Sequence, residues 1–132
     1  MEPQIIHLPK ILDKRGNLSF IEEEKQIPFA IARVYWIYDV PGGQMRPGHA
    51  FKKQQEMIVA LSGSFDIELD NGKTKQYFSL NRSYFGLYIP AGFWFQKQNF
   101  STNSLALILC STSFDENDYI RDYDEFLKFR MI

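Results

Sequence analysis

The chain has 132 residues, of which 45% are hydrophobic, and a formal net charge of −1 at neutral pH. This length predicts one domain that buries enough apolar surface to fold without disulfides. The near-balance of interspersed charges excludes nucleic acid and anionic membranes as main partners, since both require a basic surface. Because Cys110 is the single cysteine, and neither a leader nor a membrane-spanning run is present, we expect a cytoplasmic protein without disulfides.

Most of the chain consists of short extended segments separated by turn signals. These signals recur about every ten residues, and Asn71-Gly72 is a strong hairpin signal. None of the segments carries a helical stripe, so the pattern predicts an antiparallel β-sandwich or barrel. The predicted strands are Gln4–Leu8, Leu18–Glu22, Ile27–Val40, Glu56–Leu61, Ser64–Asp70, Lys73–Leu80, Tyr84–Ile89, Trp94–Phe100 and Leu105–Thr112.

The segment Ile27–Val40 shows the period-two alternation of a strand, and its two faces differ. Arg33 and Tyr35 share one face, whereas Val34, Trp36 and Tyr38 share the other. Ser64–Asp70 alternates in the same way, with apolar residues on one face and acidic residues on the other.

The end of the chain has the spacing of an amphipathic helix, predicted over about 116–130. Apolar residues recur three and four positions apart, and Asp115 and Asp118 place acidic side chains in the expected first turn. The sequence therefore predicts an all-β single domain over residues 1–132, closed by one C-terminal helix that packs on the sheet or covers a barrel end.

Two stretches have the spacing of the two cupin motifs. Residues 43–63 match G-x5-H-x-H-x4-E-x6-G, with His49 and Glu56 in place, and residues 90–99 match P-x-G-x2-H-x3-N. This resemblance implies a cupin fold, which is a double-stranded β-helix or jelly-roll barrel. In a metal cupin, three histidines and one glutamate from these motifs hold a divalent ion.

The other two histidine positions of the motifs are Phe51 and Phe95. A phenyl ring has no lone pair to donate, so two of the four metal ligands are missing. We therefore expect no metal site and no cofactor, and a cavity that has been repacked with apolar side chains.

The cupin spacing favours a functional role for His49 over a structural one. An imidazole of ordinary pKa, about 6.5, suits general acid/base chemistry at neutral pH when a partner orients it. Tyr35 either relays a proton inside the cavity or fills the core. His7 has no partner motif and is expected at the surface.

Several other side chains have both a binding and a structural interpretation. Arg15 and Arg46 lie in turn contexts, where a guanidinium either grips phosphate or is solvated. Lys52 is either a second phosphate contact or a solvated residue. Glu56 is expected to pair with Lys52, Arg46 or His49. Trp94 either stacks on a planar base or a sugar, or packs in the barrel core.

Further stretches carry a more specific resemblance. They are Ile21-Glu22-Glu23, Arg33-Val34-Tyr35-Trp36-Ile37, Arg46-x-x-His49-Ala50-x-Lys52-Lys53, Gly86-Leu87-Tyr88-x-Pro90, and Asp115-Glu116-x-Asp118-Tyr119-Ile120-Arg121-x-Tyr123-Asp124-x-Phe126. From about Ile5 to Phe129 the chain resembles the dTDP-4-oxo-6-deoxyglucose 3,4-ketoisomerases, which are RmlC-like cupins often labelled FdtA/QdtA or WxcM-like. The C-terminal stretch is the most distinctive, because generic cupins lack it.

This resemblance implies a metal-free isomerase that moves the carbonyl of a dTDP-linked 4-keto-6-deoxyhexose from C4 to C3 in deoxysugar biosynthesis. It implies that His49 is the base, that Tyr35 shuttles a proton between oxygens, and that Arg15 and Arg46 contact the substrate. It also implies a homodimer with exchanged N-terminal strands. The extended segment Gln4–Leu8 is compatible with that exchange.

The chain departs from the family pattern His-Ala-His-Lys-Lys at Phe51, and from a frequent histidine at Phe95. Acid/base groups each contribute about 10²–10⁴-fold, so the departures leave open a slow enzyme, an altered substrate or a non-catalytic accessory protein that binds a sugar nucleotide. An epimerase is disfavoured, because its second histidine is also missing. The expected substrate-binding residues are Arg15, Arg46, Lys52, Glu56, Phe51 and Trp94.

Overall fold

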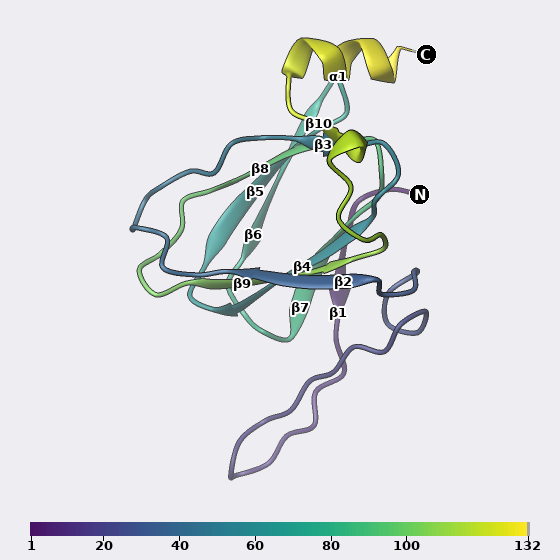
Figure 1. Ribbon diagram of the computed structural model, residues 1–132. Helices are drawn as coiled ribbons and strands as arrows, with labels where there is room; N and C mark the ends of the chain where they lie inside the picture. The colour runs from purple at the N-terminus through teal and green to yellow at the C-terminus, as the bar shows by residue number, and fades with distance from the viewer. Residues whose placement is uncertain (132) are drawn as a thin grey trace.

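The computed structural model describes residues 1–131, which fold into two facing layers of antiparallel strands with a helix at one end (Figure 1). One layer is a five-stranded sheet in the order β1-β7-β4-β9-β2. Neighbouring strands in this order are all antiparallel. The bounds are β1 Gln4–His7, β7 Phe85–Ile89, β4 Glu56–Ser62, β9 Leu105–Cys110 and β2 Arg33–Ile37.

The opposite layer consists of a three-stranded sheet, β6-β5-β8, and a two-stranded sheet, β10-β3. An isolated bridge between His49 and Phe95 connects the start of β3 to β8. The bounds are β6 Lys75–Leu80, β5 Phe65–Asp70, β8 Trp94–Gln98, β10 Tyr119–Ile120 and β3 Ala50–Phe51. The predicted all-β barrel with a C-terminal helix is therefore confirmed.

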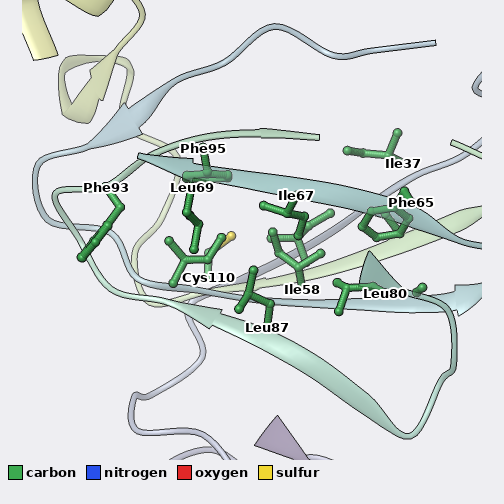
Figure 2. Close-up of a cluster of buried hydrophobic side chains, with 14 of the residues drawn as sticks. Ile37, Ile58, Phe65, Ile67, Leu69, Leu80, Leu87, Phe93, Phe95 and Cys110 are labelled. Atoms are coloured by element: carbon green, nitrogen blue, oxygen red, sulfur yellow. The ribbon is translucent and has the colours of Figure 1, made fainter. Parts of the chain in front are cut away.

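The core lies between the two layers and is built from the inward faces of the strands (Figure 2). Side chains alternate across a strand, so β5 buries its apolar face and keeps its acidic face in contact with solvent or polar partners. Each fully buried Leu, Ile or Phe contributes about 1.5–3 kcal/mol. Figure 2 labels the core residues Ile37, Ile58, Phe65, Ile67, Leu69, Leu80, Leu87, Phe93, Phe95 and Cys110.

Two predicted strands are wrong in part. Leu18–Glu22 forms no strand, and Leu18 makes only an isolated bridge to Ile11 within an arm that projects from the barrel (Figure 1). Ile27–Val40 is a strand only over β2, because residues 27–29 form a bend and Asp39 after the strand is left-handed (φ 58°). Ile27 and Phe29 are buried in a cluster with Tyr88 instead of pairing with a strand.

The C-terminal helix begins later than predicted. Helix α1 covers Tyr123–Arg130, and Asp122 caps it by accepting a hydrogen bond from the backbone N–H of Glu125. The preceding residues form a short 3-10 turn, η1 (Glu116–Asp118), and then β10. Tyr119 and Ile120 are extended because they pair with β3, which has no other strand partner.

The outer face of the five-stranded sheet is partly apolar and partly uncovered. A second cluster of buried residues, including Ile27, Phe29 and Tyr88, covers one part of it. On β2, the outward side chains of Val34 and Trp36 are 43% and 58% exposed. β1 pairs with β7 of the same chain, Gln4 opposite Tyr88. None of the helices in the described residues is long and apolar enough to cross a membrane.

Gly86 on β7 is required by close strand packing. A Cβ at this position would lie 2.5 Å from the backbone oxygen of Ile58, which cannot move without shifting β4. We expect Gly86→Ala to lower the free energy of unfolding by about 1–3 kcal/mol. Chemical denaturation measures this loss. Gly42→Ala is the control, because its added methyl would meet mainly the Thr102 hydroxyl at 3.1 Å. An equal loss of unfolding free energy in both variants would contradict the prediction.

Candidate active site

A cavity of about 440 Å³ opens between β2, the loop before β3, and the segment that contains β10. Among the described residues that line it, four are basic and none is acidic. His49, Tyr35 and Tyr119 also line it. The cavity therefore combines acid/base side chains with a positive lining, which suits an anionic ligand. The four basic residues are Arg33, Arg46, Lys97 and Arg121.

The backbone of His49 is fixed by its bridge to β8. Its N–H donates to the Phe95 carbonyl at 3.1 Å, and the Phe95 N–H donates to the His49 carbonyl at 2.9 Å. The preceding Gly48 is needed because a Cβ there would lie 2.6 Å from Nε1 of Trp94. The turn that contains Gly48 therefore packs closely against the indole of Trp94 and places His49 at the cavity.

The imidazole of His49 is surrounded by aromatic rings. Its centroid lies 4.6 Å from that of Phe95 and 5.1 Å from that of Phe51, both edge to face, and 5.6 Å from Tyr119. Its Nε2 is buried without a hydrogen-bond partner among the described residues. The two phenylalanines at the metal-ligand positions of the motifs therefore form the wall against which the imidazole packs.

This environment disfavours the imidazolium form. Burial, followed by repulsion from Lys97, lowers the pKa of His49 to about 3. The ordinary value of about 6.5 assumed from the sequence is therefore wrong for this site, because the sequence does not show how fully the rings desolvate the imidazole. At neutral pH the imidazole is uncharged and able to accept a proton.

Tyr35 lies above a buried polar network. Its hydroxyl donates to Oε2 of Glu56 at 3.3 Å, and the Gln54 side chain donates to the same oxygen at 2.7 Å. The Arg33 guanidinium donates to the side-chain Oε1 of Gln54 at 3.0 Å. Burial raises the pKa of Glu56, and burial and then Glu56 raise that of Tyr35, so the phenol keeps its proton at neutral pH.

Three of the predicted binding residues do not line this cavity. Arg15 lies on the exposed arm and pairs with Asp13 at 3.0 Å. Lys52 is exposed, and its backbone N–H donates to the carbonyl of Asp118. Trp94 packs on helix α1, 5.4 Å from the Tyr123 ring and 5.8 Å from that of Phe126. Trp94 therefore packs against the small cluster of Ala50, Ile120 and Phe126 and is not part of the barrel core.

Of the remaining predicted residues, Arg46 lines the cavity, and Phe51 and Glu56 are buried beneath it. The sequence analysis did not single out Lys97, Tyr119 or Arg121. A signal for Lys97 was available, because it shares the inward face of β8 with Phe95. Tyr119 and Arg121 were missed because their segment was predicted to be helical.

Among the described residues, no group of three or more His, Cys, Asp or Glu side chains is arranged to hold a metal ion. Glu56, a motif ligand position, is engaged by Tyr35 and Gln54 instead. The residues present do not fit a four-ligand cupin metal site.

The family model described as FdtA, "WxcM-like, C-terminal", matches residues 1–131. A TDP-4-oxo-6-deoxy-alpha-D-glucose-3,4-oxoisomerase of Aneurinibacillus thermoaerophilus is 43% identical, with 98% of this chain and 93% of the relative covered. The WlaRB TDP-quinovose 3,4-ketoisomerase of Campylobacter jejuni is 41% identical, with a TM-score of 0.92 and coverage of 96% and 97%. QdtA of Thermoanaerobacterium thermosaccharolyticum, a sugar 3,4-ketoisomerase in complex with TDP, is 35% identical, with a TM-score of 0.95 and coverage of 98% and 95%.

A more distant structure, the RmlC epimerase of Mycobacterium tuberculosis, is 15% identical and shares the fold, with a TM-score of 0.78. The chain thus has the fold of the RmlC epimerase, and its nearer relatives named above are sugar 3,4-ketoisomerases. The chain belongs to the FdtA family. The relatives confirm the predicted function, a sugar-nucleotide 3,4-ketoisomerase, over the non-catalytic alternative.

The lowered pKa of His49 predicts a specific pH dependence of stability. Below about pH 6.5 the unfolded chain binds a proton at this imidazole that the folded chain does not, so acidification favours unfolding down to about pH 3. Between pH 7.5 and 5 we expect this group to cost the wild type up to about 2 kcal/mol.

Denaturation of wild type and His49→Asn at several pH values measures this contribution, because the difference between the two cancels the other titrating groups. A His7→Asn variant is the control, since His7 is exposed on β1. If the free energy of unfolding depends on pH in the same way in the wild type and His49→Asn, the imidazole is not held neutral in the folded chain.

Proposed function

We propose that the cavity binds a dTDP-linked 4-keto-6-deoxyhexose and that His49 and Tyr35 move its carbonyl from C4 to C3. The observation that carries this assignment is an uncharged imidazole with an unpartnered Nε2 in a cavity lined by four basic side chains. The nature of the substrate is supported by QdtA, whose structures hold TDP in one case and TDP-4-keto-6-deoxyglucose in another. A diphosphate matches the positive lining.

The reaction requires two proton movements and no net oxidation. The imidazole of His49 takes the proton from C3, which gives an enediolate, and returns a proton to C4. The hydroxyl proton passes from O3 to O4, and the Tyr35 phenol, which is protonated at neutral pH and lines the same cavity, relays it. One base suffices when the proton leaves and returns on one face of the sugar.

For the nucleotide, we propose Arg46 as the diphosphate contact within the chain, because its guanidinium lines the cavity and can bind two oxygens at once. Phe51 contributes by shaping the wall behind His49, and Glu56 by holding the Tyr35 hydroxyl. Lys52 and Trp94 are left out of this set, because neither lines the cavity.

We also propose a homodimer formed through the outer face of the five-stranded sheet. The side chains of Val34 and Trp36 on β2 and of Tyr38 just after it are exposed, and exposed apolar patches of this kind mark interfaces. Exchange of N-terminal strands would form the β1–β7 hydrogen bonds between chains in the same register. In such a dimer the projecting arm would offer Arg15 to the partner's cavity. A cytoplasmic location stays a prediction.

The catalytic assignment predicts the result of an isotope experiment. With dTDP-4-oxo-6-deoxyglucose in heavy water, we expect the wild type to exchange the C3 proton and form a 3-keto product, followed by NMR. His49→Asn should lower the exchange rate by about 10²–10⁴-fold with nearly unchanged dTDP affinity. His7→Asn should match the wild type, since His7 does not line the cavity. Full exchange in His49→Asn would refute the assignment.

The dimer assignment is tested by sedimentation at micromolar concentration. We expect the wild type to have the mass of two chains and Trp36→Lys to have the mass of one, because a charge would be buried at the contact. Tyr77→Lys is the matched control, since Tyr77 is 65% exposed on β6, away from the proposed interface. A monomeric wild type would contradict the proposal.

A further inference from the structure

Lys97 on β8 is the only basic residue among the described buried side chains, with 4% of its surface exposed. Its ammonium lies 5.1 Å from the centroid of the Phe95 ring, so that it stacks on the residue against which His49 also packs. None of the ion pairs among the described residues includes it. Lys97 also lines the cavity.

A buried ammonium without a paired carboxylate costs stability, and lysine is almost never buried in this way without a partner. The groups around it are of both signs. Glu56 from β4 and Cys110 from β9 favour its charged form, whereas burial, the largest influence, and Arg46 from the loop before β3 lower its pKa. Such a costly arrangement at a cavity wall suggests a role toward a ligand rather than toward stability.

The isomerisation passes through an anion that this ammonium can stabilise. Removal of the C3 proton leaves negative charge on an enediolate oxygen, and a fixed cation in a desolvated site stabilises such charge far better than it would in water. The arginines of the cavity are less suited, because Arg121 is paired with Glu116 at 2.9 Å and Arg33 is bound to Gln54.

We propose that Lys97 is a further catalytic residue, whose ammonium stabilises the enediolate oxygen. This inference rests on the proposed function of the cavity. A stabilised enediolate favours removal of the C3 proton by His49.

The first experiment compares Lys97→Met with wild type and with Lys73→Met, an exposed lysine on the β5–β6 hairpin that does not line the cavity. We expect Lys97→Met to lower kcat by about 10²–10³-fold with KM changed only a few-fold, and Lys73→Met to leave both unchanged. A kcat of Lys97→Met within twofold of the wild type would overturn the inference.

The second readout is the NMR titration of His49, which reports whether Lys97 is charged. Loss of the Lys97 charge should raise the pKa of His49 above its wild-type value of about 3. The acidic limb of the pH–rate profile should move to higher pH in step. Lys97→Arg, which keeps a positive charge, should leave the titration nearly unmoved, and an unmoved His49 signal in Lys97→Met would overturn the inference.

A third comparison avoids dependence on one variant that could fail to fold. Lys97→Cys in a Cys110→Ala background is assayed before and after aminoethylation of the unfolded chain and refolding, which restores an ammonium at nearly the original distance, with the modification confirmed by mass spectrometry. Recovery of at least tenfold in kcat supports the inference, and no recovery overturns it. If the wild type itself does not convert the sugar nucleotide, the proposed function fails, whereas an active wild type with an equally active Lys97→Met rejects only the role of Lys97.

Discussion

The desolvation of one imidazole is the constraint on which the rest of the site depends. His49 is held by a two-hydrogen-bond bridge to Phe95 and enclosed by Phe51, Phe95 and Tyr119, so that burial outweighs the Pro47 backbone hydrogen bond that favours its protonated form. The same rings explain why β10 must pair with β3, because only that pairing places Tyr119 against the imidazole. The helix begins after this pairing, at Asp122, because Tyr119 and Ile120 are already committed to an extended conformation.

The site also separates charge by depth. Basic side chains line the cavity, whereas the buried carboxyl of Glu56 lies beneath Tyr35 and is held by Gln54. A buried carboxyl is tolerated when it accepts hydrogen bonds, and here two neutral donors meet one of its oxygens. This arrangement fixes the phenol that faces the substrate without placing negative charge in the path of a diphosphate.

Features that depend on strand periodicity could be predicted from the sequence. The inward placement of Tyr35 beside Arg33, the exposure of Trp36, and the barrel itself follow from period-two alternation and motif spacing. The position of Arg15 could not be predicted, because a turn sequence does not specify where an arm projects. The perturbed pKa of His49 and the burial of Lys97 likewise arise from contacts between strands distant in sequence, which no local pattern encodes.

The loss of two motif histidines and the retention of an isomerase function are compatible for an electrostatic reason. A metal ion bound by His49 would occupy the lone pair that proton transfer requires, whereas phenyl rings at positions 51 and 95 leave Nε2 free. The rings also exclude water, which lowers the local dielectric constant and strengthens the action of each nearby charge on the bound sugar. Phenylalanine in place of histidine at positions 51 and 95 therefore removes two groups that could carry protons. It also strengthens the electrostatic effect of the remaining base and cations on the bound sugar.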